Sequence, residues 1–282
     1  MPNARRSTPD AMTLVFVHLT RFRWLHGLVE SMRVFPIAGY ILRRLPLTRR
    51  FKRGRLTYRI TSLDQFSIAY EIFVHESYKP ALTSYRVETF IDLGCNAGWF
   101  ALWLDMVQPS TTRLGLLVEA NPRMASEAAW HLKRNGLERW TVKQGAVGLA
   151  PGVPVAEFHV YPSSAASSLL PFERAHQLPV KGRAIEMAVP AISAGDEWQR
   201  LFGRIAVDLL KVDVEGKELD LFTYEASFIQ QRVRRIILEW HKWTVSLADL
   251  DAQLESIGFN RRGVFDEDQL TGMALYDRSG VD

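Results

Sequence analysis

The sequence predicts an α/β fold built on a mainly parallel β-sheet. Short apolar runs typical of buried strands alternate along residues 89–241 with segments of helical periodicity. A glycine turn follows the first of these strands, and charged residues end the fourth and fifth. Strands that alternate with helices form parallel sheets with right-handed crossovers, so we expect these turns at one sheet edge.

The length and composition suit one large domain with an extension. The chain has 282 residues, of which 47% are hydrophobic. Cys95 is the only cysteine, so an internal disulfide and a cysteine-rich metal site are both excluded. The sequence contains neither a run of about 18 apolar residues nor a signal-peptide pattern. We therefore expect a cytoplasmic protein without a membrane-spanning helix.

Positive charge is concentrated in residues 1–60, a basic arm in front of a domain over residues 61–282. The arm carries 13 lysines and arginines against two acids, a net charge of +11; the whole chain carries +4, so the domain carries −7. Apolar residues and arginines are interleaved over residues 12–45, with breaks at Pro36 and Pro46, which predicts one or two amphipathic helices. Such an arm can pack on its own domain or on a second subunit, dock at a membrane surface, or bind nucleic acid.

The elements of the first half follow from local patterns. Residues 56–60 alternate like a strand. Asn121 is a suitable helix N-cap, Pro122 fits the first helical turn, and Gly136 ends the same helix. The predicted order is strand Thr89–Leu93, helix Ala97–Val107, strand Leu114–Glu119, helix Pro122–Asn135, and a further strand over Trp140–Gln144 and Ala146–Val147.

The second half continues the alternation and ends in a hairpin. Extra strands are expected at Val155–Val160 and Ala184–Val189. The strands Phe259–Val264 and Met273–Tyr276 form a terminal pair that fits an antiparallel edge on a parallel sheet. Between these, the sequence predicts helix Asp196–Phe202 with Gly203 just past its end, strand Ala206–Val214, helix Lys217–Tyr224, strand Arg234–Trp240 and helix Leu247–Ile257.

The turn after the first strand has the pattern Asp-x-Gly-x-x-x-Gly, formed by Asp92, Gly94 and Gly98. A strand, a glycine turn and a helix N-terminus direct backbone N–H groups at a ligand. Asn96 stands at the second glycine of the dinucleotide pattern, which argues against a nicotinamide cofactor and favours S-adenosylmethionine (SAM). Gly94 and Gly98 would let the backbone approach the amino acid moiety of SAM, and Asp92 would hold a water or the amino group. The alternative is an ordinary strand–turn–helix glycine pair.

An acidic residue and a third turn extend this cofactor site. Glu119 ends the second strand 25 residues after Gly94, where an acid can accept hydrogen bonds from ribose hydroxyls. The turn after the third strand, with Gly145 and Ala146, is expected at the adenine edge. The alternatives are a helix-capping or surface acid and an ordinary turn. The neighbouring residues assigned to the same site are Trp99, Ala120 and Asn121.

Charged residues at the ends of the fourth and fifth strands form the candidate reaction centre. Lys211, Asp213 and Glu215 alternate and so share one strand face, and Glu239 and His241 end the neighbouring strand. Burying these charges unpaired would be costly, which a position at the sheet edge avoids. A hydroxyl nucleophile needs a base: His241 has a suitable unperturbed pKa, and Asp213 or Glu215 would serve if desolvated. The alternatives are a core histidine and a salt bridge to Lys211.

The same acids are also compatible with binding of a metal ion. Asp213, Glu215 and Glu239 offer hard oxygen ligands that suit Mg²⁺. The spacing alone does not establish such a site, so no metal ligand is assigned.

The glycine turn and the acidic strand end together resemble the FkbM family of SAM-dependent methyltransferases. They read Asp-Leu-Gly-Cys-Asn-Ala-Gly-Trp-Phe at 92–100 and, more specifically, Leu-Lys-Val-Asp-Val-Glu-Gly-Lys-Glu at 210–218. The resemblance covers about residues 65–278, and Lys217 departs from a position that is often apolar or aromatic in the family. Further segments in the family's order are 118–122, 145–148, 167–170 and 237–241.

The resemblance implies a Rossmann-like class I SAM methyltransferase fold, with a mainly parallel seven-stranded sheet and an antiparallel C-terminal edge strand. It also implies O-methylation of a sugar or polyketide hydroxyl in bacterial secondary-metabolite, capsule or lipopolysaccharide biosynthesis. Asp213 and Glu215 would lie at the reaction centre. The implied SAM contacts are Asp92, Gly94, Asn96, Gly98 and Glu119.

We therefore expect a SAM-dependent O-methyltransferase that acts on a hydroxyl of a sugar, a glycan or a glycosylated natural product. A lipid-linked acceptor would bring it to the inner membrane surface, and the oligomeric state stays open. The serine-rich loop 161–170 and segment 171–183 would cover the acceptor, unless they form only a linker. A nucleic-acid methyltransferase needs a basic groove, whereas this domain is acidic. A catalytically silent scaffold would not need Asp213 and Glu215.

Overall fold

The computed structural model describes residues 44–50, 56–62, 64–161, 167–170 and 184–280. The amphipathic helices predicted over residues 12–45 therefore fall outside the described residues, apart from Arg44 and Leu45. The same holds for segment 171–183 and for residues 162–166 of the serine-rich loop.

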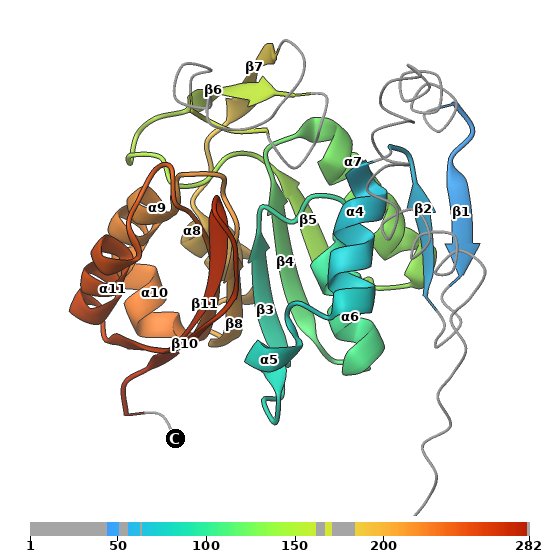
Figure 1. The fold of residues 1–282 in the computed structure, drawn as a ribbon. Helices are drawn as coiled ribbons and strands as arrows, with labels where there is room; N and C mark the ends of the chain where they lie inside the picture. Colours follow the sequence, from blue (N-terminus) through green and yellow to red (C-terminus); the bar gives the residue numbers. More distant parts are fainter. Residues whose placement is uncertain (1–43, 51–55, 63, 162–166, 171–183, 281–282) are drawn as a thin grey trace, which may run out of the picture.

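A seven-stranded sheet forms the centre of the described structure. Its strands are β3 (Thr89–Leu93), β4 (Leu114–Glu119), β5 (Trp140–Gln144), β8 (Val207–Val212), β9 (Val233–His241), β10 (Phe259–Glu267) and β11 (Thr271–Arg278). They lie in the order β10-β11-β9-β8-β3-β4-β5, and the five strands from β9 to β5 pair in parallel (Figure 1). β11 lies antiparallel between β9 and β10. The mainly parallel sheet with an antiparallel C-terminal edge is thus confirmed.

Helices cover both faces of this sheet and enclose two apolar cores (Figure 1). One face carries α8 (Ala194–Phe202), α9 (Glu218–Tyr224), α10 (Ala226–Arg232) and α11 (Leu247–Ser256). The other carries α4 (Asp64–Tyr70), the π-helix η1 (Glu71–His75), α5 (Lys79–Leu82), α6 (Trp99–Val107) and α7 (Pro122–Asn135). Side chains alternate between the cores along each strand: Leu210 packs in the first and Leu209 in the second.

The predicted bounds of α7 are confirmed, whereas α6 starts later in the structure than predicted. The Asn121 side chain accepts hydrogen bonds from two backbone N–H groups at the start of α7, and Gly136 caps its end at φ 66°, as predicted. α6 begins at Trp99, two residues after the predicted Ala97. The reason is that Asn96 and Gly98 adopt left-handed conformations, with φ 50° and 80°, which a right-handed helix does not contain.

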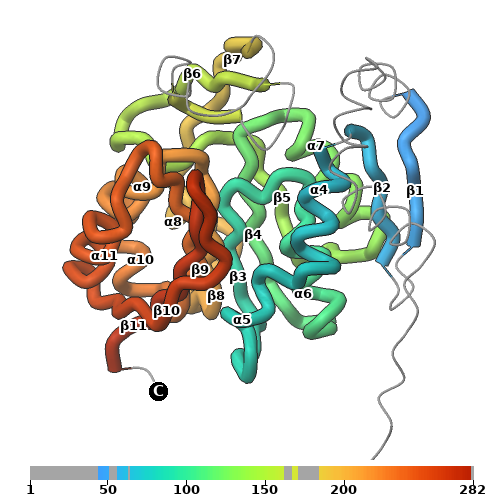
Figure 2. Tube along the Cα trace, viewed as in Figure 1, coloured from blue at the N-terminus to red at the C-terminus, as the bar shows by residue number. Residues whose placement is uncertain are grey.

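Two hairpins lie outside the central sheet. The predicted extra strands pair as β6 (Val155–Val160) and β7 (Ile185–Pro190), above the carboxyl ends of the central strands (Figures 1 and 2). Within the basic arm, β1 (Leu47–Arg50) pairs with β2 (Thr57–Ile60). β2 packs on α7, where Arg59 forms an ion pair of 2.6 Å with Glu127. None of the helices in the described ranges combines the length and apolar character needed to cross a membrane.

Candidate active site

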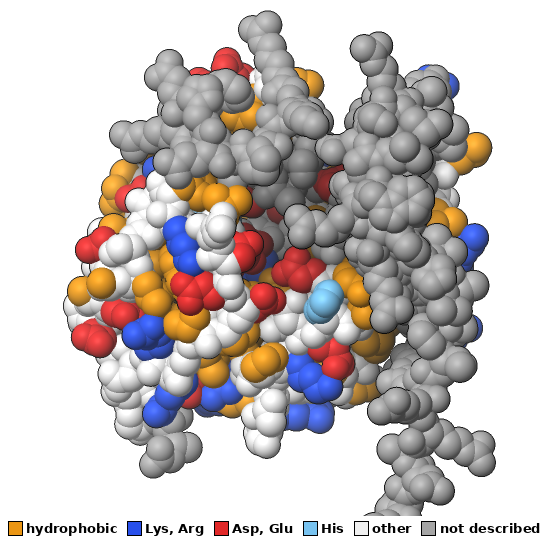
Figure 3. Space-filling view, viewed as in Figure 1, with side chains coloured by type: hydrophobic (Ala, Val, Ile, Leu, Met, Phe, Trp, Pro, Cys, Tyr) orange, Lys and Arg blue, Asp and Glu red, His pale blue; other side chains and the backbone are white. Residues whose placement is uncertain are grey.

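A cavity of about 320 Å³ opens at the carboxyl ends of β3, β4, β8 and β9. Acidic side chains gather around the hollow on this face of the molecule (Figure 3). Of the predicted site residues, all but Asp92, Gly98 and Asn121 contribute to its wall. Those twelve are Gly94, Asn96, Trp99, Glu119, Ala120, Gly145, Ala146, Lys211, Asp213, Glu215, Glu239 and His241.

Residue 94 must be glycine because the ends of two strands approach each other closely there. It has φ 71°, and a Cβ atom added to it would lie 1.7 Å from the backbone oxygen of Asp213. The turn after β3 therefore interlocks with the turn after β8, since only glycine leaves room for that carbonyl. This contact, rather than an approach of the backbone to a cofactor, is what the structure itself demands of Gly94.

The side chains or backbone of the three remaining predicted residues do not line the cavity. Asp92 is fully buried, and its carboxylate lies 3.3 Å from Lys211 Nζ. Burial raises the pKa of Asp92, and the positive charge of Lys211 opposes that rise. Gly98 has φ 80° and packs near Ala128 on α7. Asn121 caps α7, so its side chain is occupied there.

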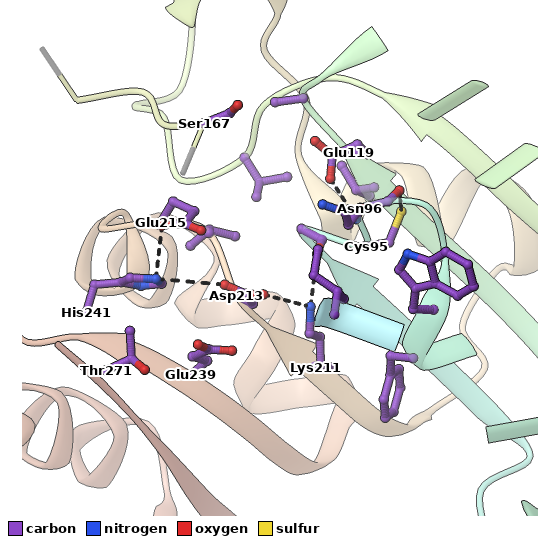
Figure 4. A pocket seen from close by; sticks show the side chains of 18 of the residues that line it. Cys95, Asn96, Glu119, Ser167, Lys211, Asp213, Glu215, Glu239, His241 and Thr271 are labelled. Atoms are coloured by element: carbon purple, nitrogen blue, oxygen red, sulfur yellow. Dashed lines mark hydrogen bonds and ion pairs between the residues drawn. The ribbon is translucent and has the colours of Figure 1, made fainter. Parts of the chain in front are cut away.

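Glu119 is held in one orientation by two backbone donors. Oε2 accepts a hydrogen bond of 2.8 Å from the N–H of Asn96 (Figure 4), and Oε1 accepts one of 2.8 Å from the N–H of Asn121. Burial raises the pKa of Glu119 to about 7, despite these two hydrogen bonds. Each carboxylate oxygen retains acceptor capacity beyond the one hydrogen bond that it receives.

Lys211 joins the glycine turn to the acidic side of the cavity. Its Nζ donates to the backbone oxygen of Gly94 over 2.9 Å and lies 3.3 Å from Asp213 (Figure 4). It also lies 3.3 Å from Asp92. Burial disfavours the ammonium, but Asp92 and Asp213 outweigh it and hold the pKa of Lys211 well above its usual value. Lys211 is therefore a fixed cation that binds backbone and carboxylates.

His241 lies between two carboxylates, which changes the role that its residue type suggests. Nδ1 is 2.7 Å from Glu218 and Nε2 is 3.1 Å from Glu215. A neutral imidazole has one donor and one acceptor nitrogen, whereas ionised carboxylates only accept, so this arrangement fits an imidazolium. Burial opposes the charge, but Glu215 and Glu218 hold the pKa of His241 well above its usual value. A protonated ring cannot take a proton from a substrate.

Glu239 is, with Glu71, one of two acids on the cavity wall whose carboxylates have no partner among the described residues. Within the described ranges, its carboxylate has neither a hydrogen bond nor an ion pair. Desolvation, followed by the negative charge of Asp213, holds its pKa well above the usual range. Glu239 also faces a second cavity of about 330 Å³, which shares part of the wall of the first. The other residues around this second cavity are Glu71, His75, Asp266, Asp268, Thr271 and Met273.

The walls contain several acids that sequence reasoning did not assign to the site. Glu71 comes from η1 and Asp268 from the connection between β10 and β11, next to Thr271, the first residue of β11. Desolvation and the nearby carboxylates of Asp266 and Asp213 raise the pKa of Glu71 to about 7. The only signal for Glu71 in the sequence is an acid inside an apolar-rich segment. The β10–β11 connection carries no comparable signal.

A short turn fixes the position of Glu215 under the roof of the cavity. Glu215 and Gly216 have φ 51° and 97°, which places a non-glycine residue in the left-handed region. The Ser168 hydroxyl donates a hydrogen bond of 2.8 Å to the backbone oxygen of Glu215. The neighbouring Ser167 and Leu169 line the cavity, so the roof and the acidic turn are directly connected.

One cluster in the cavity has the composition of a metal site. Asp213, Glu239 and His241 place potential ligand atoms within 4.8 Å of one another. Both nitrogens of His241 already face glutamates, so that ring would have to leave a carboxylate in order to bind a cation. A magnesium ion held by oxygen ligands alone is left open by the sequence, and no ligand is assigned to it.

The family model of the methyltransferase FkbM domain matches residues 92–261. No curated protein matches the sequence. Similar solved structures include an FkbM methyltransferase from Methylobacillus flagellatus KT, with 17% identity, a TM-score of 0.45, and coverage of 68% of this chain and 43% of that one.

A second solved structure is RosA from Streptomyces davawensis, an N,N-8-amino-8-demethyl-D-riboflavin dimethyltransferase. It has 13% identity and a TM-score of 0.44, and the match covers 77% of this chain and 57% of RosA. A SAM-dependent methyltransferase from Aquifex aeolicus has 12% identity and a TM-score of 0.42, covering 73% of this chain and 90% of that one. The chain thus spans about half the length of the first two proteins.

The family model matches the part of the chain that forms most of the cavity. Residues 92–261 include the glycine turn, Glu119 and both acidic strand ends, and they make up more than half of the chain. The chain belongs to the FkbM methyltransferase family.

Proposed function

We propose that this protein is a SAM-dependent O-methyltransferase that acts on a hydroxyl of a sugar, a glycan or a glycosylated natural product. One observation carries the proposal: a single cavity is bordered by the glycine turn and Glu119 on one side and by Asp213, Glu215 and Glu239 on the other. Donor and acceptor groups would therefore meet in one space. Membership of the FkbM methyltransferase family supports the reaction type.

The chemistry of the donor side fits SAM. When bound, SAM supplies an electrophilic methyl group on a positively charged sulfonium. Glu119 would accept hydrogen bonds from the ribose hydroxyls, because its two oxygens are held in place by backbone N–H groups and keep further acceptor capacity. Gly145 and Ala146 would border the adenine. The surrounding carboxylates complement a cationic ligand.

On the acceptor side, we assign the role of base to Glu239. Methyl transfer depends mainly on the alignment of nucleophile and methyl carbon, and a hydroxyl must also lose its proton. Glu239 combines a raised pKa with freedom from protein partners in the described ranges. Asp213 is held by Lys211 at 3.3 Å and would orient the hydroxyl. His241 would hold Glu215 in position rather than accept a proton.

The second cavity suits a polyhydroxylated acceptor. Carboxylates are strong hydrogen-bond acceptors, and Glu71, Glu239, Asp266 and Asp268 all border this space. A sugar presents several hydroxyl donors at once, so its ring would find a partner on each side. A nucleic acid is disfavoured, because phosphate groups require lysines and arginines along the groove. Among the described residues of the two cavity walls, the only lysine is Lys211, which is buried and paired.

The basic arm is a separate proposal. With a net charge of +11 over residues 1–60 it would hold the enzyme at an anionic membrane, where a lipid-linked acceptor is found. Co-sedimentation with anionic liposomes, before and after deletion of residues 1–43, tests this. Unchanged sedimentation of the deleted protein would assign the arm to packing or to a second subunit instead.

Calorimetry tests the cofactor directly. SAM is expected to bind the purified protein with micromolar affinity, a range usual for enzyme substrates. Glu119→Ala should weaken binding, whereas the exposed Glu138→Ala, in the turn after α7, should not. Binding of NAD in place of SAM would contradict the proposal. Transfer of a labelled methyl group from SAM into candidate glycans or cell-envelope lipid extracts would then identify the acceptor, and exclusive labelling of nucleic acid would overturn the substrate class.

A further inference from the structure

Three potential metal ligands meet on the β6–β7 hairpin, away from the candidate reaction centre. Glu157 and His159 are two residues apart on β6, so their side chains share one face of the hairpin. Glu186 on β7 is the direct cross-strand partner of His159. The backbone N–H and C=O of His159 bond to Ser168 on the other side of β6, so His159 and Glu186 form a non-hydrogen-bonded pair. In such pairs the side chains lie closest together.

His159 differs from the other buried histidines in the described ranges because its ring lacks a hydrogen bond. It is 6% exposed, Nδ1 has no partner, and Nε2 has only Glu157 at 3.8 Å. His131, by contrast, accepts from the N–H of Arg59 at 2.9 Å and lies 2.8 Å from the oxygen of Ala97. His241 has a carboxylate at each nitrogen. A buried imidazole with no hydrogen bond is costly, which indicates a missing partner.

We propose that Glu157, His159 and Glu186 bind a divalent transition-metal ion, for which zinc is the best fit. Their potential ligand atoms lie within 4.8 Å of one another, close enough for small side-chain rotations to bring them around one ion. Zinc takes nitrogen and carboxylate oxygen ligands, and three protein ligands leave a fourth position for water. Two carboxylates would neutralise its charge. Magnesium is disfavoured, because it prefers an octahedral shell of oxygen ligands.

The position of this site gives the ion a structural role. Phe158, the neighbour of His159, points to the opposite face of β6 and lines the main cavity. The strand pairing continues through Ser168, whose hydroxyl reaches the backbone of Glu215. An ion that ties β6 to β7 would therefore hold the roof of the cavity in place. It would take no part in the reaction.

Zinc titration of the full-length protein tests the site. After treatment with EDTA and buffer exchange, we expect calorimetry to show zinc binding at one site, unaffected by millimolar Mg²⁺. His159→Ala should abolish this binding, and Glu157→Gln and Glu186→Gln should each weaken it by about tenfold or more, since each removes a ligand. Glu138→Gln is the matched control, because Glu138 is an exposed glutamate outside the hairpin, and it should bind zinc like the wild type.

Two further measurements keep the outcome unambiguous. Asp213→Asn removes a ligand of the other candidate cluster, so zinc binding that survives in Asp213→Asn and is lost in His159→Ala assigns the ion to the hairpin. If His159→Ala fails to fold, the site is tested by the variants of the two exposed glutamates, Glu157→Gln and Glu186→Gln. The visible absorption of Co²⁺ bound to the wild type and to these variants gives a second measurement. The proposal would be overturned if the wild-type protein did not bind zinc. It would also be overturned if Glu157→Gln and Glu186→Gln both bound zinc as tightly as the wild type. Either result would leave the proposed function untouched, because that function is tested separately by SAM binding.

Discussion

Replacing Lys211 by methionine would leave a buried carboxylate without its counter-ion. Asp92 is fully buried, and neither of its oxygens has a hydrogen bond, so Lys211 at 3.3 Å is its only compensation among the described residues. Methionine keeps most of the side-chain volume but none of the charge. The perturbation is therefore electrostatic rather than a change in packing.

The size of the effect follows from that distance. Two unit charges 3.3 Å apart attract each other by about 5 kcal/mol at an effective dielectric constant of about 20. Breaking a buried ion pair by removing one partner typically costs about 3–5 kcal/mol. We expect Lys211→Met to lower the free energy of unfolding by that amount at pH 8. The loss should shrink as the pH falls, because Asp92 without Lys211 has a raised pKa and becomes neutral by protonation.

Urea unfolding followed by tryptophan fluorescence provides the measurement. Lys217→Met is the matched control, since its ion pair of 2.7 Å with Asp220 lies on the surface and should contribute less than about 1 kcal/mol. The double variant Asp92→Asn, Lys211→Met should recover part of the loss, because it removes the uncompensated charge. A Lys211→Met protein as stable as Lys217→Met, or strictly additive effects in the double variant, would refute the reasoning.

Three further predictions concern the cavity. Glu239→Gln should lower turnover by about 10²- to 10⁴-fold and leave SAM affinity within about twofold, measured by methyl-transfer kinetics and calorimetry; full activity would exclude Glu239 as the base. Gly94→Ala should destabilise the protein in urea far more than Gly136→Ala, because the new Cβ meets Asp213 at 1.7 Å while Gly136, also at positive φ, has nothing within 4 Å. Since the pKa of His241 is raised on folding, its stabilising contribution is complete below pH 6.5 and is lost as the pH rises through the folded-state pKa. His241→Gln should therefore flatten the alkaline decline of the unfolding free energy; an unchanged decline would contradict the imidazolium.

The sequence was most informative where signals are local. The bounds of β3, β4 and α7 match the predicted ranges, and those of α7 do so because Asn121, Pro122 and Gly136 mark helix ends through their own conformational preferences. β5 ends at Gln144, so its predicted continuation over Ala146–Val147 is wrong: Ala146 forms only an isolated bridge with Ala191. α10 was missed because it follows α9 directly, with only Glu225 between them and neither glycine nor proline to mark the break. Its helical state depends on packing of Phe228 and Ile229 against the sheet.

The site shows the same division between topology and side-chain packing. The alternation of strands and helices placed the ends of β3, β4, β8 and β9 at one edge, which brought most predicted residues to the cavity. It did not reveal the direction of each side chain: Asp92 turns to Lys211, and His241 meets Glu218 on α9. Glu71 and Thr271 are 200 residues apart, so their meeting at one wall depends on the completed fold.

The position of β11 has a consequence for the order in which the protein folds. β10 precedes β11 in the chain, yet it joins the sheet only through β11, which pairs with β9 on its other side. Until β11 docks, β9 presents an unpaired edge and β10 has no partner, a condition that exposes folding intermediates to aggregation. β11 also brings Thr271 to both cavities and Met273 opposite Glu239. The folding chain would thus complete the wall of the second cavity in the same step that pairs the free edge of β9.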